Sequence, residues 1–364
     1  MSVLAGIGVL AGAGVVGSLL GGLAGTYRFR PARADVPLPG LRAPLRVAFL
    51  SDLHFGPFIR RGSLRRWVDA TREQEPDLIL LGGDMLDHWV GRDLSPLLTE
   101  LARLRAPLGV YAVWGNHDHA VLRGRASPSG MPGFARALED LAGVRVLCNA
   151  ACRVRDDLFV AGVDDLQAGH PDVTGTLAQT PAGGCSSPAG RGPAPAGDDT
   201  ATAAATAAPG PSAPGPSAPG PTAPGATAPV RTAPVRTAPV RTAPQPAASG
   251  ARREGAREGA PTSATILLSH NPDILPRVPE TVSLTLCGHT HGGQVCLPGY
   301  GALYTASAYG RRFVAGWVRA PAMAYVSRGL GVSGAPLRFA CPAEITVLDL
   351  APAGGATPAA APGG

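Results

Sequence analysis

The chain has 364 residues, a formal net charge of +6 at pH 7 and a sequence pI near 9.3. Every basic residue is Arg, these residues are dispersed, and only 5% of the chain is aromatic, so we predict no dedicated surface for nucleic acid. Six cysteines at irregular spacings form no Cys-x-x-Cys pair, and we interpret them mostly as small buried residues.

The first segment of the chain is apolar. Residues 3–25 carry no charge, which is long enough for a helix to cross a bilayer, and Tyr27 with three Arg residues follows as an interfacial anchor. A cleaved export signal would have basic residues before the apolar run, and none are present there. We therefore favour a transmembrane anchor over residues 1–27, followed by a linker over 28–44.

This anchor predicts a single-pass protein of the plasma membrane, with the membrane as a partner through the N-terminal helix. The Arg residues after the apolar run favour a cytoplasmic domain, whereas a Thr- and Pro-rich insert is commoner in exported proteins. The two arguments leave the side of the catalytic domain open.

Five apolar segments have the length of buried strands, and each is followed by residues that can bind metal. The segments are 45–50 before Asp52 and His54, 78–81 before Asp84, 110–114 before Asn116, 265–268 before His270, and 283–287 before His289 and His291. Amphipathic stretches at 64–75, 94–104 and 134–141 predict helices between the first strands. Beyond residue 291, short strands without long helices predict a second sheet packed on the first. The fold class is α/β, with the ligands at strand ends.

A low-complexity segment interrupts this pattern. Residues 175–263 are almost entirely Ala, Pro, Gly, Thr and Ser. Such a composition cannot bury a core, so we expect a disordered Pro/Ala-rich insert, and we favour a tolerated surface expansion over a tether. The catalytic domain then consists of 45–174 and 264–350, and residues 351–364 form a disordered tail. The two parts total roughly 220 residues, the size of one domain.

The polar residues after the five strands form one set of metal ligands. Two divalent ions a few ångströms apart need a carboxylate that bridges them, with neutral imidazole and amide groups around them, so that positive charge remains for a phosphate. A single buried His or a turn-forming Asp has an ordinary structural explanation, but the whole set indicates a dinuclear hydrolytic site. Nitrogen and oxygen ligands without Cys suit Mn, Fe or Zn and do not decide among them.

Five short blocks of sequence, in this order, resemble those of a known family. They are Ser-Asp-Leu-His at 51–54, Gly-Asn-His-Asp at 115–118, Gly-Val-Asp-Asp at 162–165, Leu-Ser-His-Asn-Pro at 268–272, and residues 288–294. Over about 45–350, apart from the insert, the chain resembles the calcineurin-like metallophosphoesterases, and more closely their membrane-associated bacterial phosphodiesterase branch. The resemblance implies a four-layer αββα sandwich of two mixed sheets flanked by helices.

The resemblance also assigns roles, position by position. It puts Asp52, His54 and His291 on a first metal and Asn116, His270 and His289 on a second, with Asp84 bridging the two. His117 matches the family's catalytic histidine, which protonates the leaving oxygen or stabilises charge on the phosphoryl group, and Asp87 would orient it. Arg328 matches a position near the end of the domain, where it would either contact a substrate phosphate or form an internal ion pair.

These assignments predict a metal-dependent phosphohydrolase and favour a phosphodiesterase. Two divalent ions bring about +4, Asp52 and Asp84 remove two charges and a bridging hydroxide removes one, which leaves about one positive charge for an anionic diester. The bridging hydroxide would attack phosphorus in a phosphodiester small molecule or a lipid-linked substrate. His88 and Trp89 replace the Arg-Gly of protein Ser/Thr phosphatases, which disfavours a phosphoprotein. A nucleotide-sugar lipid pyrophosphatase and a non-catalytic scaffold that retains the fold are the alternatives.

Overall fold

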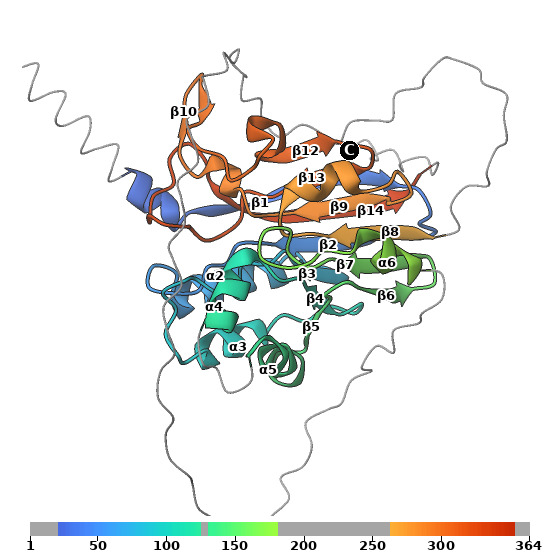
Figure 1. Ribbon diagram of the computed structural model, residues 1–364, viewed down its shortest axis with the longest axis horizontal. Coiled ribbons are helices and arrows are strands. Elements are labelled where there is room, and N and C mark those ends of the chain that lie inside the picture. Colours follow the sequence, from blue (N-terminus) through green and yellow to red (C-terminus); the bar gives the residue numbers. More distant parts are fainter. Residues whose placement is uncertain (1–20, 125–129, 181–262, 354–364) are drawn as a thin grey trace, which may run out of the picture. The chain divides into compact units, whose positions relative to one another are not determined.

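Two six-stranded mixed sheets form the centre of the protein (Figure 1). The computed structural model describes residues 21–124, 130–180 and 263–353. The first sheet has the strand order β1-β14-β2-β3-β4-β5. Its strands are β1 (Phe29–Leu38), β2 (Leu45–Leu50), β3 (Leu78–Leu81), β4 (Val110–Ala112), β5 (Val144–Val146) and β14 (Ala343–Pro352). Strands β2 to β5 run parallel to one another, β14 pairs antiparallel with β2, and β1 pairs parallel with β14.

The second sheet has the strand order β12-β13-β9-β8-β7-β6. Its strands are β6 (Ala150–Arg155), β7 (Leu158–Gly162), β8 (Ala264–Leu268), β9 (Leu284–Cys287), β12 (Gly316–Arg319) and β13 (Met323–Val326). The four inner strands are parallel, and β6 and β12 pair antiparallel at the two edges. A separate two-stranded antiparallel hairpin consists of β10 (Cys296–Leu297) and β11 (Gly301–Ala302).

The two sheets pack face to face through a shared apolar core. Phe49, Leu80 and Tyr111 of the first sheet lie in one buried cluster with Ile266 and Leu286 of the second. The outer face of the first sheet is covered by α2 (Arg61–Arg72), α3 (Ser95–Leu101), α4 (Asn116–Gly124), α5 (Gly130–Ala137) and the π-helical turn η1 (Leu138–Ala142). The outer face of the second is covered by α6 (Val173–Ala178), η2 (Pro272–Arg277) and η4 (Gly310–Phe313). The predicted four-layer sandwich is confirmed.

Apolar spacing explains these elements. Helix α2 buries Leu64, Trp67, Val68 and Thr71, which are three or four residues apart and therefore share one helix face. Strand β3 has the sequence Leu-Ile-Leu-Leu with all four side chains buried, because it lies inside a sheet that is covered on both faces. Parallel strands end at the same edge of a sheet, so the residues that follow β2, β3 and β4 are brought together there.

The N-terminal prediction is corrected by the structure. Most of the predicted span over residues 1–27 lies outside the described residues. Within the part of the chain that is described, no helix is both long and apolar enough to cross a bilayer. Residues 21–26 form a short helix whose Gly22 carbonyl accepts a hydrogen bond from Arg338 N at 3.0 Å, so these residues contact the catalytic domain. The expectation of a single-pass plasma-membrane protein is corrected accordingly.

The predicted linker over 28–44 contains a strand. Strand β1 pairs with β14 along its whole length, and Val36 and Leu38 enter the core between the sheets. The other residues of β1 are exposed or half-buried, since it is an edge strand. Such a strand has a weak apolar pattern, and the two Arg residues and two Pro residues within it obscure that pattern in the sequence.

Two further boundaries shift by a few residues. Helix α6 continues to Ala178, so the domain extends past the predicted start of the insert at residue 175, and Asp172 caps this helix by accepting a hydrogen bond from Gly175 N. Residues 181–262 of the predicted insert lie outside the described residues. Strand β14 likewise continues to Pro352, and the predicted tail beyond residue 353 lies outside them.

Candidate metal centre

The predicted ligands all follow strand ends. Asp52 and His54 follow β2, Asp84 follows β3, Asn116 begins α4 after β4, His270 follows β8, and His289 and His291 follow β9. Nine described non-glycine residues have positive φ, and five of these are Asp52, His54, Asp84, His289 and His291. Left-handed backbone is unfavourable for these residue types and persists only where the surrounding structure fixes it, which is typical of functional sites.

Asp52, His54 and His291 form a first group of candidate ligands. One ligand atom from each lies within 4.8 Å of the other two, and all three residues are buried. His54 Nε2 lies 3.0 Å from His291 Nε2, which lies 3.5 Å from Asp52 Oδ1. Two imidazole nitrogens and a carboxylate that converge in a buried space provide the donors that a divalent ion binds.

Asp84, His270 and His289 form a second group with the same property. His270 Nε2 lies 3.2 Å from both Asp84 Oδ2 and His289 Nδ1. Asp84 Oδ2 also lies 3.6 Å from His54 Nε2 in the first group. One carboxylate oxygen therefore faces both groups, as a bridging ligand must.

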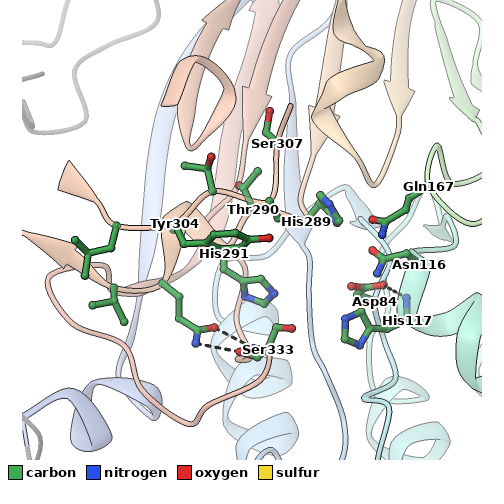
Figure 2. A pocket seen from close by; sticks show the side chains of 16 residues that line it. Asp84, Asn116, His117, Gln167, His289, Thr290, His291, Tyr304, Ser307 and Ser333 are labelled. Atoms are coloured by element: carbon green, nitrogen blue, oxygen red, sulfur yellow. Dashed lines mark hydrogen bonds between the residues drawn. The ribbon is translucent and has the colours of Figure 1, made fainter. Parts of the chain in front are cut away.

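Asn116 completes the donor set. Its Oδ1 atom is buried and has no hydrogen-bond partner among the described residues. A buried amide oxygen left without a partner costs about 1–3 kcal/mol, and a cation would satisfy it. Figure 2 shows Asn116 beside Asp84 and facing the same cavity as His289 and His291. The donors present thus fit two divalent ions, and the structure brings all seven predicted ligands together.

Main-chain contacts orient the ligand side chains. His270 donates from Nδ1 to the Gly82 carbonyl at 2.8 Å, so its Nε2 atom faces the ligand group. Nε2 can bind a metal once the proton that it shares with Asp84 has left. Asp52 accepts a hydrogen bond from His289 N at 3.0 Å. This bond joins the end of β2 in one sheet to the end of β9 in the other, so the two sheets fix the site jointly.

Burial keeps three of the histidines neutral. It lowers the pKa of His54 and of His291 well below the usual 6.5, and the Arg338 guanidinium lowers that of His291 further. Burial and the neighbouring His270 lower the pKa of His289. Neutral imidazole is the form that binds a metal, so these side chains are ready to do so at neutral pH.

His270 and Asp84 behave differently. Burial opposes the charged form of each, but their mutual attraction and their hydrogen bond outweigh it. The pKa of His270 is raised well above 6.5, and the pKa of Asp84 is lowered well below 3.8. Without metal the two form an imidazolium–carboxylate pair, and a metal that binds His270 Nε2 must displace its proton.

His117 lies beside both groups. Its backbone N donates to Asp84 Oδ1 at 2.9 Å, and its ring meets the His54 ring edge-on at 4.5 Å between centroids. The side chain is partly exposed and lines the cavity, and burial lowers its pKa below 6.5. Asp87, which we expected to orient His117, lies with Oδ2 3.9 Å from His54 Nδ1. Among the hydrogen bonds of the described residues, none joins Asp87 to His117, although their ligand atoms lie within 4.8 Å.

The ligand groups open into a cavity of about 630 Å³. One wall carries Asp84, Asn116 and His117, and the opposite wall carries Tyr304 and Ser307 from the segment after β11 (Figure 2). The lining residues of this cavity include no Arg. The positive charge that balances an anionic substrate must therefore come from bound metal ions and not from Arg side chains.

Residues 45–169 match the family model described as "Calcineurin-like phosphoesterase". This segment is a calcineurin-like phosphoesterase domain. The family consists of hydrolases of phosphoric esters that use divalent metals, in agreement with the two ligand groups. The three remaining histidines of the candidate metal centre follow strands β8 and β9, which lie beyond the matched segment.

Several proteins are similar to this chain over most of its length. It is 24% identical to "Uncharacterized metallophosphoesterase YkuE" of Bacillus subtilis, over 84% of this chain and 78% of that protein. It is 26% identical to "Phosphodiesterase YaeI" of Escherichia coli, over 85% of this chain and 83% of that protein. It is 27% identical to "Transmembrane protein with metallophosphoesterase domain" of Bos taurus, over 88% of this chain. The chain spans 57% of the length of this last relative.

Arg328 takes the second of its two predicted roles. Its Nη1 atom lies 2.5 Å from Glu344 Oε2, and Glu344 is fully buried. Arg328 is not among the residues that line the cavity beside the ligand groups. The assignment of Arg328 to substrate phosphate is corrected, because a buried carboxylate holds its guanidinium inside the fold.

Sequence reasoning did not identify two residues that support the ligands. Arg338 is buried, donates to the carbonyls of Gly331 and Arg328, and lies with Nη2 3.3 Å from His291 Nδ1. Asp118 is buried and accepts hydrogen bonds from Gly115 N and from Leu86 N, both at 3.0 Å. Asp118 follows the Gly-Asn-His block directly, which was a usable signal, whereas the partners of Arg338 are mainly backbone atoms that no residue pattern reveals.

The sequence also gave no role to His88. Its ring stacks on the His117 ring at 3.9 Å between centroids and 35° between planes. His88 is exposed, so it covers the outer side of His117 and leaves the inner side to the cavity. The signal in the sequence was its position directly after Asp87.

Proposed function

We propose that this protein is a metal-dependent phosphodiesterase with a dinuclear centre. The observation that carries the proposal is the position of Asp84 Oδ2, which faces His270 in one ligand group and His54 in the other. A carboxylate shared between two groups of imidazole ligands is the arrangement that two-metal hydrolases use. The name of the Escherichia coli relative, a phosphodiesterase, supports the same reaction class.

The donors would hold two divalent ions, of which Mn, Fe and Zn fit the nitrogen and oxygen ligands. Bound there, the two ions would lower the pKa of water towards neutrality and neutralise charge on the phosphoryl oxygens. The chain's own residues position the ester: His289 and His291 lie on one side of the cavity mouth, and Asn116 and His117 on the other (Figure 2).

His117 would protonate the leaving oxygen. Among the imidazole rings that line the cavity, it alone belongs to neither of the two groups joined by Asp84, so its nitrogen is available for proton transfer. Burial lowers its pKa, which makes the protonated form a stronger acid at the cost of its population at neutral pH. His54 and His88 flank the ring and restrict its orientation.

The charge of the site favours a diester over a monoester. Asp52 and Asp84 are the two carboxylates of the ligand groups, so two divalent ions and an attacking hydroxide would leave about one positive charge. A diester carries one negative charge and a monoester carries about two near neutral pH. No Arg lines the cavity to balance the second charge.

The full chain, purified without chelator, tests this proposal. We expect about two ions per chain by elemental analysis and hydrolysis of bis(p-nitrophenyl) phosphate that chelator abolishes and Mn restores. The rate with p-nitrophenyl phosphate should be lower by about tenfold or more. A folded, metal-loaded protein without diester hydrolysis would contradict the proposal, and a preference for the pyrophosphate bond of a nucleotide sugar would favour a pyrophosphatase instead.

A further inference from the structure

Exposed apolar side chains are concentrated beside the cavity. Nine large hydrophobic residues of the described chain are exposed, and five of these lie between residues 297 and 309. They are Leu297, Tyr300, Leu303, Tyr304 and Tyr309, with exposed fractions from 42% to 75%. Isolated exposed apolar residues are ordinary, but a cluster in one short segment marks an interaction surface.

The segment is a projecting hairpin and the irregular stretch that follows it. β10 pairs with β11, and Figure 1 shows β10 standing away from the two sheets. At its base, an isolated bridge joins Val295 to Phe339, and the Cys296 N donates to the Phe339 carbonyl at 2.9 Å. A hairpin anchored at its base presents its apolar tip to the surroundings and does not bury it in the fold.

Two Arg residues lie beside this hairpin. Residues 296–312 contain Arg311 and Arg312 and no Asp or Glu. The acidic side chain that contacts this segment, Asp273, accepts hydrogen bonds from Ser307 and from Ala308 N. The Arg311 guanidinium lies 4.0 Å from the centroid of the Tyr300 ring, and Arg312 lies 5.2 Å from that of Phe313. Tyr and Leu side chains bordered by Arg match the boundary of an anionic bilayer, where aromatic rings lie at headgroup depth and guanidinium groups meet phosphates.

The surface continues into the cavity. Leu303 and Tyr304 are exposed on the hairpin side and also line the cavity of the metal centre, together with Ser307. A protein partner would need a large complementary face, whereas a narrow convex tip of Leu and Tyr is suited to shallow insertion between headgroups. A headgroup phosphodiester at such a surface would lie next to the ligand groups.

We propose that residues 296–312 form a docking surface for a lipid bilayer that contains anionic lipids, and that the cavity receives phosphodiesters presented at that surface. The second half of this statement rests on the proposed function. The surface acts by shallow contact from the hairpin and needs no membrane-spanning helix.

The test measures hydrogen exchange of the full chain with vesicles of phosphatidylcholine, with and without phosphatidylglycerol. Because residues 3–25 are apolar and could bind vesicles themselves, the readout is local. Peptides covering 296–304 should gain protection with the anionic vesicles and gain less with phosphatidylcholine alone. A Leu297→Ser/Tyr300→Ser variant should lose this protection, and the control Leu141→Ser, which removes an exposed apolar side chain on η1, should keep it.

A charge variant and a soluble substrate complete the test. Arg312→Gln should weaken vesicle binding by the hairpin about fivefold, since one cation near an anionic surface has an effect of that size. The Leu297→Ser/Tyr300→Ser variant should hydrolyse a soluble diester at the wild-type rate, because neither residue lines the cavity. Absence of protection over 296–304 would overturn the docking surface whatever the activity. Protection in a protein that hydrolyses no diester would leave the surface standing and refute only the proposed function.

Discussion

The two walls of the cavity differ in burial, polarity and backbone conformation. The ligand wall is buried, polar and held in left-handed backbone, as at Asp84 with φ 51° and 2% exposure. The wall from β11 onwards is exposed and apolar, as at Tyr304 with 75% exposure. The first wall can position ions precisely, because hydrogen bonds and burial hold its ligand residues in place. The second can adapt to whatever group a substrate carries.

This contrast separates chemistry from specificity. Ligands fixed by strand ends from both sheets determine which bond is broken, and changes there should abolish the reaction. Residues on the hairpin side determine which ester remains in the cavity, and changes there should alter binding of particular substrates. The predictions below test this division, from the largest expected effect to the smallest.

Replacing Asp84 by Asn should have the largest effect. The variant removes the carboxylate that faces both ligand groups and leaves His270 without the charge that raises its pKa. Since metal ions supply several kcal/mol of stabilisation to the transition state, kcat should fall by about a thousandfold or more. Diester hydrolysis and metal content should be measured together, with Asp93→Asn, an exposed Asp next to α3, as the matched control. Wild-type activity with wild-type metal content would refute the bridging role.

Replacing His117 by Gln should give the next largest effect, and one of a different kind. The side chain lies outside the two groups joined by Asp84, so metal content should be unchanged, while kcat falls by about a hundredfold or more through loss of the general acid. A substrate with a better leaving group should suffer less, because it needs less protonation. Equal losses for p-nitrophenyl and alkyl leaving groups would contradict the proton transfer. His170→Gln is the control, since His170 is exposed and does not line the cavity.

The sequence predicted the ligand wall well for a simple reason. Each ligand follows a buried apolar strand. Strands such as β2 and β3 are short apolar runs that can be recognised from the sequence alone. Once Asp52, Asp84 and His270 are placed at the ends of adjacent strands in two packed sheets, their convergence is nearly dictated. The four-layer order of the fold follows from the same strands and the amphipathic helices between them.

The sequence predicted the rest poorly because the information there is not periodic. Arg338 contacts His291 from 47 residues away, and its other partners are carbonyl groups. Strand β1 exposes most of its side chains, so it resembled a linker. The sequence predicted residues 21–26 to be part of a transmembrane span. In the structure, Gly22 and Gly25 lie against Leu337 and Arg338. Small residues are compatible with a membrane helix and with close packing on a domain, and composition does not distinguish these cases.

The pH dependence of metal binding should distinguish the two ligand groups. The raised pKa of His270 means that metal entering the second group competes with a proton at and above pH 6.5, so its apparent affinity should rise with pH by up to about tenfold per unit until that pKa is passed. His54 and His291 have pKa values well below 6.5, so the first group should show little change in this range. Calorimetric titration with Mn in buffers of different ionisation heat measures the proton released. Two sites with the same pH dependence would contradict this assignment.

The same pair gives a stability effect with a defined sign. In metal-free protein the raised pKa of His270 stabilises the fold below the unfolded value of 6.5, and this contribution is lost as pH rises through the folded pKa. The depressed pKa of Asp84 contributes stability above 3.8 that is lost as pH falls through its folded value. Chelated protein should therefore melt at lower temperature at high pH, and metal should reverse the trend.

Replacing Tyr304 by Ala should have the smallest effect and the most informative pattern. The ring lies on the exposed wall, where an aromatic contact contributes about 0.5–1.5 kcal/mol, so KM for a diester with an aromatic group should rise by about threefold to tenfold. With kcat unchanged, the loss would be one of binding shared by the ground and transition states, as expected of a side chain that belongs to neither ligand group. A dialkyl diester should show little change, and Tyr309→Ala, an exposed ring outside the cavity, is the matched control. A fall in kcat would instead mean that this wall helps to place the reacting phosphorus, and the separation of chemistry from specificity would fail at this residue.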